Sequence, residues 1–230
     1  MSFWSRHQIF EKNSVILVGG ILAVIAIGGL VEITPLFYLK STIEKVDGVR
    51  PYTPLELAGR DVYIAEGCFN CHSQMIRPFR HETERYGEYS KPGEFVYDHP
   101  FLWGSRRIGP DLAREGGKYP NLWHVRHMED PRAITQKSIM PAYPNLLNAP
   151  LDFAGIQRRV DVMAMLGVPY GDAVNRAPQM ARAQADSIAR GIEGEGGPKG
   201  LQDKQIVALV AYLQRLGRDI KAPQVARSTR

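Results

Sequence analysis

Residues 68–72 read Cys-Phe-Asn-Cys-His and hold both cysteines of this 230-residue chain. Two cysteines separated by two residues and followed directly by a histidine form the attachment pattern of c-type haem. In that chemistry each thiol adds across one vinyl group of the ring, and the histidine gives a nitrogen to the iron. We therefore predict a covalent haem on Cys68 and Cys71, with His72 as an axial ligand.

Three other uses of a Cys-x-x-Cys pair fit the sequence less well. A zinc site normally takes four ligands, often from two such pairs, and the chain has no second pair. A thioredoxin-type pair opens the helix of a β-α-β unit, and no strand pattern precedes Cys68. A disulfide between Cys68 and Cys71 would close almost no loop and would add little stability.

The second axial ligand decides what the iron can do, because a methionine there makes the haem a six-coordinate carrier with a raised potential. Residues 138–144 read Ser-Ile-Met-Pro-Ala-Tyr-Pro. Pro141 moves Met140 out of helical geometry, so a stiff loop presents the thioether. We expect Met140 to be the ligand. The competing candidates are three histidines: His99, His124 and His127.

A long apolar stretch lies near the N-terminus. It runs uncharged from Val15 to Val31 and continues past Glu32 to Leu39. About 20 apolar residues in a helix cross the hydrocarbon core of a bilayer. A signal peptide would have a shorter apolar region followed by a small-residue cleavage site, and none precedes Lys40. We predict a tail and retained transmembrane anchor over residues 1–39, followed by a linker over residues 40–54.

The rest of the chain is expected to form one helical domain over residues 55–220, with a C-terminal tail over residues 221–230. It is polar and contains no run of alternating β-branched residues, so a sheet is not expected. Residues 73–103 have little periodicity and are predicted to be a long irregular insertion. Apolar spacing and capping residues predict helices at 55–67, 121–129, 152–166, 177–192 and 202–216.

The net charge of +5 does not indicate a nucleic-acid partner. The basic residues are scattered among acidic ones, which is typical of a solvated surface rather than of a phosphate-binding patch.

The order of three motifs resembles class I cytochromes c. The haem motif is followed by Gly109-Pro110-Asp111-Leu112 and then by Met140-Pro141-Ala142-Tyr143. This resemblance implies a mainly α domain in which the Pro110 carbonyl accepts the Nδ1 proton of His72. It also implies a crossing of the first and last helices, where Gly67 would meet Tyr212.

A closer resemblance is to the mono-haem subunit, subunit II, of cbb3-type cytochrome c oxidases. It rests on Glu32-Ile33-Thr34-Pro35 at the end of the anchor and on the segments 103–112 and 123–132. It extends from the anchor to about Tyr170 and resumes at the last helix, so residues 171–200 match least well.

That resemblance implies an electron relay. The chain would take electrons from a donor, either another cytochrome c subunit or a soluble cytochrome c. It would pass them to a haem of the integral-membrane catalytic subunit. The oxygen chemistry would belong to that partner, so the chain is expected to be part of a cytochrome c oxidase without a catalytic site of its own.

The same resemblance implies a location in the bacterial inner (plasma) membrane, with one span, a cytoplasmic N-terminus and a periplasmic haem domain. The charges alone point slightly the other way, because Arg6 and Lys12 precede the span while Lys40, Lys45 and Arg50 follow it. Long domains translocate largely regardless of such a bias.

The loop over residues 103–107 carries a further expectation. The resemblance implies a calcium ion shared with the catalytic subunit, and a serine oxygen is a suitable hard ligand. Ser105 is therefore a candidate calcium contact. Arg106 and Arg107 could pair with haem propionates through parallel hydrogen bonds.

Two alternative functions are weighed. The anchored cytochrome c of a nitric-oxide reductase is similar in layout, but the insertion at 73–103 favours the oxidase. A ligand-binding haem enzyme or sensor would need an open distal pocket with acid–base groups, and the Met140–Pro141 loop argues against one.

Overall fold

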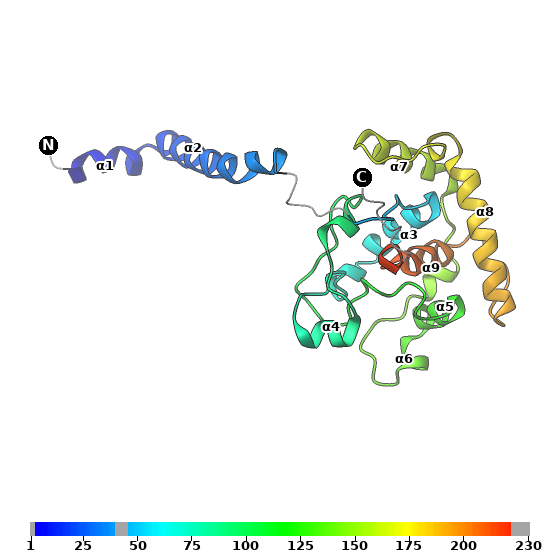
Figure 1. Cartoon of the computed structure of the whole chain (residues 1–230). Coiled ribbons are helices and arrows are strands. Elements are labelled where there is room, and N and C mark those ends of the chain that lie inside the picture. The colour runs from blue at the N-terminus through cyan, green and yellow to red at the C-terminus, as the bar shows by residue number, and fades with distance from the viewer. Residues whose placement is uncertain (1–2, 40–45, 222–230) are drawn as a thin grey trace, which may run out of the picture. The chain divides into compact units, whose positions relative to one another are not determined.

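The computed structural model describes residues 3–39 and 46–221 (Figure 1). The chain forms two compact units that divide between Glu44 and Lys45. Within the described ranges every regular element is a helix and no β-strand occurs, which confirms the mainly α prediction. Of the predicted linker, residues 40–45 lie outside the described part, as do residues 222–230 of the predicted C-terminal tail.

The first unit is helical from end to end. Helix α1 (Phe3–Lys12), which the sequence did not predict, is followed by α2 (Ser14–Ile33) and the short turn η1 (Thr34–Phe37). The chain breaks at Asn13, whose side chain accepts hydrogen bonds from two backbone N–H groups at the start of α2. No side chain of α2 is buried, and Ser14–Phe37 is long and apolar enough to cross a membrane.

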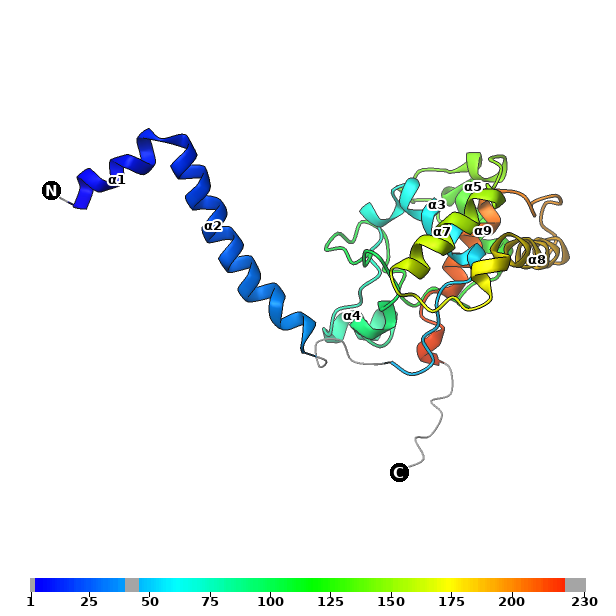
Figure 2. The same ribbon diagram turned by 90° about the horizontal axis from the view of Figure 1, so that it is seen from above.

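The core of the second unit is built on two crossed helices, α3 (Pro54–Ala65) and α9 (Gln205–Arg215), which lie side by side in Figures 1 and 2. A Cβ at Gly59 would overlap the Ala208 carbonyl and lie 2.9 Å from Tyr212 Cβ. The two backbones touch because position 59 has no side chain. Tyr212 is fully buried at this crossing.

This crossing corrects one expectation. Tyr212 is indeed the aromatic residue on the last helix, but its glycine partner is Gly59 and not Gly67. Gly67 lies beyond the end of α3 with φ +70°, and a Cβ there would meet only the Asn70 side chain. Its role is to turn the chain, since glycine adopts this left-handed conformation without strain.

Helices α7 (Phe153–Met165) and α8 (Ala173–Gly194) pack on the outside of this pair. The predicted cap of α7 is confirmed, because Asp152 accepts a hydrogen bond from Gly155 N. Helix α8 starts four residues before its predicted start and bends at Arg176, two residues before Pro178. It buries a stripe of alanines at every fourth position: Ala173, Ala177, Ala181, Ala185 and Ala189.

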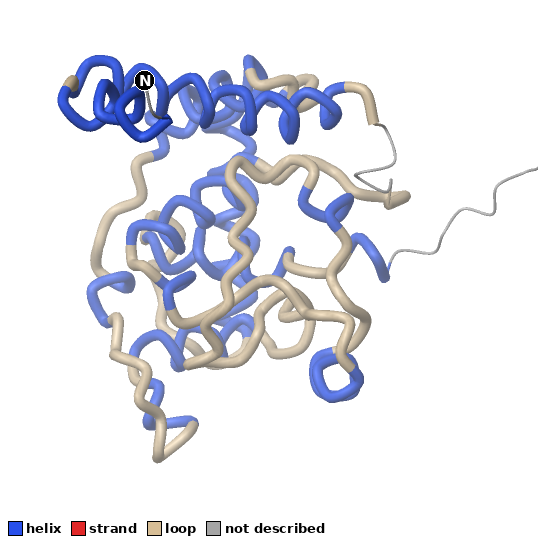
Figure 3. The backbone as a smooth tube through the Cα atoms, turned by 90° about the vertical axis from the view of Figure 1, so that its left-hand side faces the viewer, coloured by secondary structure: helices blue, strands red, loops and turns tan. Residues whose placement is uncertain are grey.

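The remaining elements are short and joined by long loops (Figure 3). Helix α5 (Asn121–Glu129) has its predicted bounds and is followed by α6 (Pro131–Ile134) and η4 (Pro144–Leu147). The predicted irregular segment contains one unpredicted helix, α4 (Arg80–Tyr86), and the turn η3 (Pro92–Phe95).

Part of the predicted linker belongs to the second unit. The Arg50 side chain donates hydrogen bonds to both carboxylate oxygens of Glu56, at 2.8 and 2.9 Å. The backbone carbonyl of Arg50 accepts a hydrogen bond from Arg215 of α9. The chain therefore contacts the domain from Arg50 onward, before α3 begins at Pro54.

Candidate haem-binding site

The cysteine–histidine motif lies immediately after α3. Gly67 turns the chain, and the 3₁₀ turn η2 (Cys68–Asn70) continues into His72, whose N–H donates to the Cys68 carbonyl at 2.9 Å. Both cysteines are free and half-buried. The two thiols and the imidazole are thus presented from one compact turn, as attachment of a single ring requires.

One edge of the His72 ring contacts the backbone of Gly109 and Pro110. Its Nδ1 lies 2.8 Å from the Pro110 carbonyl, and a Cβ at Gly109 would lie 2.7 Å from the same nitrogen. Burial lowers the pKa of His72, and the Pro110 contact and Asp111 oppose that shift. Because a carbonyl only accepts, the neutral ring donates from Nδ1 and leaves the Nε2 lone pair available to a metal.

The protonation state of the cysteine thiols bears on whether the pair could bind zinc or carry out thiol redox chemistry. Burial, together with the nearby charge of Glu66, raises the pKa of Cys68 to about 11. A thiol of that kind is protonated at neutral pH and is a poor nucleophile or thiolate ligand. The described residues contain no group of three or more His, Cys, Asp and Glu side chains that could hold a metal ion.

The Met140 loop lies against both the motif and α5. Its Tyr143 N–H donates to the Met128 carbonyl of α5 at 2.7 Å. Burial and then the electrostatic proximity of Cys68 raise the pKa of Tyr143. Met140 itself is half-buried and packs against the core. The structure thus brings the two predicted ligand segments, far apart in sequence, to the same region.

The three histidines that compete with Met140 as the second axial ligand differ in their burial. His99 is exposed in a loop. His124 is buried, and burial, followed by the charge of His127, lowers its pKa to about 4. The pKa of His127 is lowered by burial and then by the charge of His72, so this ring lies within electrostatic reach of the haem motif.

A haem fits the residues present. Several half-buried apolar side chains, from the motif, the segment after Pro110 and the Met140 loop, pack against the same core cluster: Cys68, Leu112, Met140, Tyr143 and Leu147. A flat apolar ring could cover such groups. In addition, the buried Nδ1 of His127 has no hydrogen-bond partner among the described residues. Buried polar atoms without a partner are uncommon in folded proteins, and a bound group is one source of the partner.

The loop with Ser105 is exposed but tied to the motif through Gly104, whose N–H donates to Ser73 Oγ at 3.2 Å. Arg107 is already engaged, because its guanidinium donates to the Met75 carbonyl and to Glu82, each at 2.7 Å. The Nε of Arg107 has no hydrogen-bond partner among the described residues, and Arg106 is exposed, so both arginines stay candidates for pairing with a propionate.

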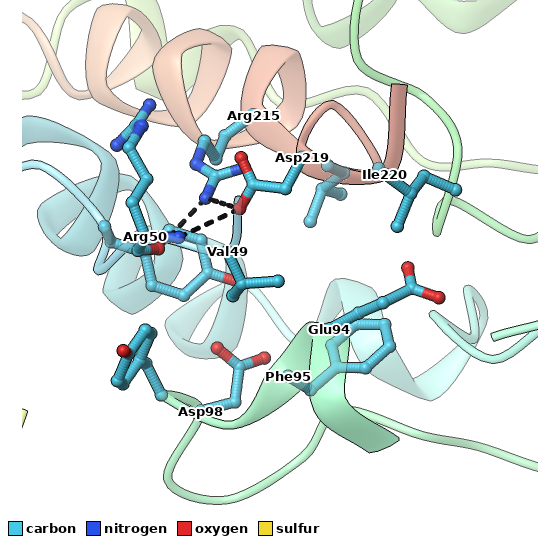
Figure 4. A pocket seen from close by; sticks show the side chains of 12 residues that line it. Val49, Arg50, Glu94, Phe95, Asp98, Arg215, Asp219 and Ile220 are labelled. Atoms are coloured by element: carbon cyan, nitrogen blue, oxygen red, sulfur yellow. Dashed lines mark hydrogen bonds and ion pairs between the residues drawn. The ribbon is translucent and has the colours of Figure 1, made fainter. Parts of the chain in front are cut away.

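A cavity lies away from this site (Figure 4). It is lined in part by Arg50, Tyr52, Asp98, Arg215 and Asp219, and it shares no residue with the haem motif or the Met140 loop. Burial raises the pKa of Asp98 to about 6, against the charge of Arg60. Asp219 accepts hydrogen bonds from the backbone N–H of Arg50 and from the side chain of Arg215. These bonds join the start of the domain to the end of α9.

Sequence reasoning missed two features of this site. The first is the close approach of Gly109 to the His72 ring. The second is a stack of rings in which Trp123 lies between Tyr119 and His127. The spacing of four residues between Trp123 and His127 could have indicated their contact, since such residues are neighbours on a helix face, whereas Tyr119 precedes α5 and gives no such signal.

Fold and site together define the chain as a cytochrome c of an electron-transport system. A model of the family described as cytochrome c oxidase, mono-heme subunit/FixO matches residues 7–220, and the chain belongs to this family. This confirms the resemblance to the mono-haem subunit of cbb3-type oxidases and favours the oxidase over the nitric-oxide reductase. Comparison with curated proteins finds no matching relative.

Proposed function

We propose that the chain relays electrons from a cytochrome c donor to the haem of the catalytic subunit of a cbb3-type oxidase. The observation that carries this proposal is the convergence of the haem motif, the Pro110 carbonyl and the Met140 loop. When bound, the haem supplies an iron that takes up and releases one electron.

Each site residue has one role in this proposal. Cys68 and Cys71 would hold the ring through thioether bonds, and His72 and Met140 would bind its iron. The Pro110 carbonyl accepts from Nδ1 of His72, which leaves Nε2 of this ring available to the iron. An iron bound by both side chains would carry electrons without binding a substrate, and oxygen reduction would belong to the partner.

The proposed location is the bacterial plasma membrane, with the N-terminus in the cytoplasm and the haem domain in the periplasm. The exposed apolar surface of α2 supports a membrane anchor. The proposed domain boundaries are an anchor over 1–39, a linker over 40–54, the haem domain over 55–220 and a tail over 221–230. The donor is another cytochrome c subunit or a soluble cytochrome c.

The relay can be tested in the purified oxidase complex by rapid mixing with a reduced cytochrome c donor. The c-type haem of this chain is expected to be reduced before the haem of the catalytic subunit. In a complex with Cys68→Ala and Cys71→Ala, reduction of the catalytic haem should be slowed severely. A complex with Met165→Ala, at a methionine 85% exposed on α7, is the control. Equally fast reduction in the cysteine variant would contradict the relay.

Ser105 keeps its proposed calcium role as part of the contact with the catalytic subunit. Its exposure leaves the hydroxyl free to meet a partner surface. Since the described residues offer no cluster of acidic ligands here, backbone oxygens or the partner would have to complete the site. Calcium measured in purified Ser105→Ala complex should fall, and full occupancy would end this proposal.

A further inference from the structure

The Asp98 carboxylate is buried in the insertion with one of its oxygens unpaired. Its side chain is 1% exposed, and Oδ2 makes no hydrogen bond within the described residues. Arg60 Nε lies 3.9 Å from Oδ1, which is too long for a hydrogen bond, and the same guanidinium donates to the Pro100 carbonyl. A carboxylate that is buried and incompletely paired takes up a proton more readily than an exposed one.

The cavity of Figure 4 gives this carboxylate access to water. Asp98 and Arg215 both line it, and Arg215 Nε is a second buried atom without a hydrogen-bond partner in the described part of the chain. The cavity volume is about 30 Å³, and an ordered water needs about 10–15 Å³. Because the exposed Arg50 also lines the cavity, a proton can reach Asp98 from solvent.

Charged and titratable groups from the surrounding elements face Asp98 or line its cavity. They are Tyr52 before α3, Glu56 and Arg60 of α3, Glu94 of η3, the neighbouring His99, Tyr212 and Arg215 of α9, and Arg50 and Asp219. Several of these charges are paired with others: Arg50 with Glu56, Arg215 with Asp219, and Glu94 with Arg114. Burial prevails over the charge of Arg60 and raises the pKa of Asp98 to about 6.

Three tyrosine rings in contact connect Asp98 to the haem motif. The Tyr52 hydroxyl is hydrogen-bonded to Asp98. The Tyr52 and Tyr212 rings have centroids 5.6 Å apart, and the Tyr212 and Tyr63 rings 5.4 Å apart. The Tyr63 hydroxyl donates to the backbone carbonyl of His72 at 3.1 Å. Tyr63 and Tyr212 are fully buried, so a charge at the motif acts on Asp98 through protein, where screening is weak.

We propose that Asp98 is a redox-linked proton site, which takes up a proton from solvent more readily once the haem has been reduced. The inference rests on the proposed covalent haem at the motif. The electron comes from the reduced donor and converts ferric to ferrous iron. The proton comes from water in the cavity and binds an oxygen of Asp98, so the added charge is neutralised and no further group is oxidised or reduced.

The direction of the coupling follows from the charges. An electron adds one negative charge at the haem, which disfavours the anionic form of Asp98. Two unit charges about 15–20 Å apart at an effective dielectric constant of about 20 change the proton affinity of one of them about four- to sixfold. Three rings with spacings of 5.6 and 5.4 Å span a distance of this order. By linkage, the midpoint potential should fall as the pH rises through an interval that starts near 6.

The test is a redox titration of the full chain with its haem between about pH 5 and pH 8. The wild-type midpoint should fall through the interval and level off above it. Asp98→Asn has a neutral side chain of similar shape, so its midpoint should stay level and match that of the wild type at the acid end. Asp186→Asn, the same change at an exposed carboxylate on α8, is the control and should titrate like the wild type.

A second measurement detects the proton itself. The reduced-minus-oxidised infrared difference spectrum at about pH 6.5 should contain the carbonyl band of a protonated carboxylic acid, which shifts in heavy water. This band should be absent from Asp98→Asn.

Tyr52→Phe keeps the test decisive if Asp98→Asn fails to retain haem. The variant keeps the ring against Tyr212 and removes the hydroxyl, whose hydrogen bond lowers the pKa of Asp98. The interval over which the midpoint falls should therefore move to higher pH.

Each contrary result has a separate meaning. A wild-type midpoint that does not change with pH would overturn the proton site. The same falling interval in Asp98→Asn, or an interval that Tyr52→Phe leaves unmoved, would assign the linkage to another group, such as a haem propionate. A wild-type chain that holds no haem would overturn the proposed function, and this inference with it.

Discussion

At the scale of single residues, the site depends on the absence of a side chain as much as on the ligands. Gly109 allows the His72 ring to lie against the backbone while Nδ1 meets the next carbonyl, that of Pro110. The haem motif and Pro110 could be identified from the sequence, because these motifs follow one another in a recognisable order. The close packing of Gly109 against the His72 ring could not be predicted, since it depends on two segments that meet only in the folded protein.

Gly109→Ala is predicted to displace the His72 ring, because the new Cβ would overlap it. Overpacking of this kind costs about 1–3 kcal/mol. The variant should retain less six-coordinate haem in its absorption spectrum. Gly104→Ala is the control on the same loop, where a Cβ would make only ordinary contacts at 3.7 Å or more. Identical spectra for both variants and the wild type would contradict the close packing.

Met140→His is predicted to keep the iron six-coordinate and to lower its midpoint potential, because a thioether favours reduced iron more than imidazole does. Redox titration of the full chain measures this directly. Met165→His, at an exposed methionine on α7, should titrate like the wild type. An unchanged midpoint in Met140→His would assign the ligand to another residue.

At the scale of elements, helices with an apolar stripe and a cap could be predicted closely from the sequence. Helix α5 has its predicted bounds, and α7 starts at its predicted Asp152 cap. Helix α4 was missed because its seven residues are nearly all polar, so no apolar period marks it. The crossing glycine was misplaced because its partner, α9, lies more than 140 residues away in sequence.

Gly59→Ala is predicted to separate α3 from α9 and to lower the free energy of unfolding by about 1–3 kcal/mol. The loss would occur even though alanine is the better helix former. Denaturant unfolding of the full chain in detergent is the measurement. Gly191→Ala on α8, where a Cβ meets only Asn121 at 3.6 Å, should be neutral or stabilising. Equal effects at both positions would argue against the crossing.

The insertion around α4 is predicted to depend on Glu82. Burial alone would raise the pKa of Glu82, but hydrogen bonds from Arg77 and Arg107 hold it down at about 2. Glu82→Gln should therefore lower the free energy of unfolding at neutral pH by about 1–3 kcal/mol. The exposed Glu84, paired with Arg80, offers the control Glu84→Gln, with an expected change below about 0.5 kcal/mol.

The pH dependence of this effect follows from the sign of the shift. A carboxylate with a lowered pKa in the folded state stabilises the fold fully above its ordinary value of 4.5. That contribution is lost as the pH falls from 4.5 toward 2. The difference between wild type and Glu82→Gln should shrink over this interval, and a difference that stayed constant would contradict the paired carboxylate.

At the scale of the whole molecule, the sequence predicts a membrane anchor and a helical haem domain, and the structure contains an apolar helix and a separate helical unit. Composition and periodicity are enough for this division, because a bilayer span and a water-soluble domain differ in both. The ligand pair is less accessible from sequence. Met140 follows His72 by 68 positions, and the contacts that hold its loop, such as the bond from Tyr143 to Met128, are not marked in the sequence.

The central claim is that the chain holds one covalent haem whose two axial positions are filled by His72 and Met140. The most direct test is the optical spectrum of the reduced full chain with and without carbon monoxide. A six-coordinate relay is predicted to give the same spectrum in both cases. A spectrum shifted by carbon monoxide would show an open or easily displaced sixth position and would contradict the account in favour of a ligand-binding haem protein.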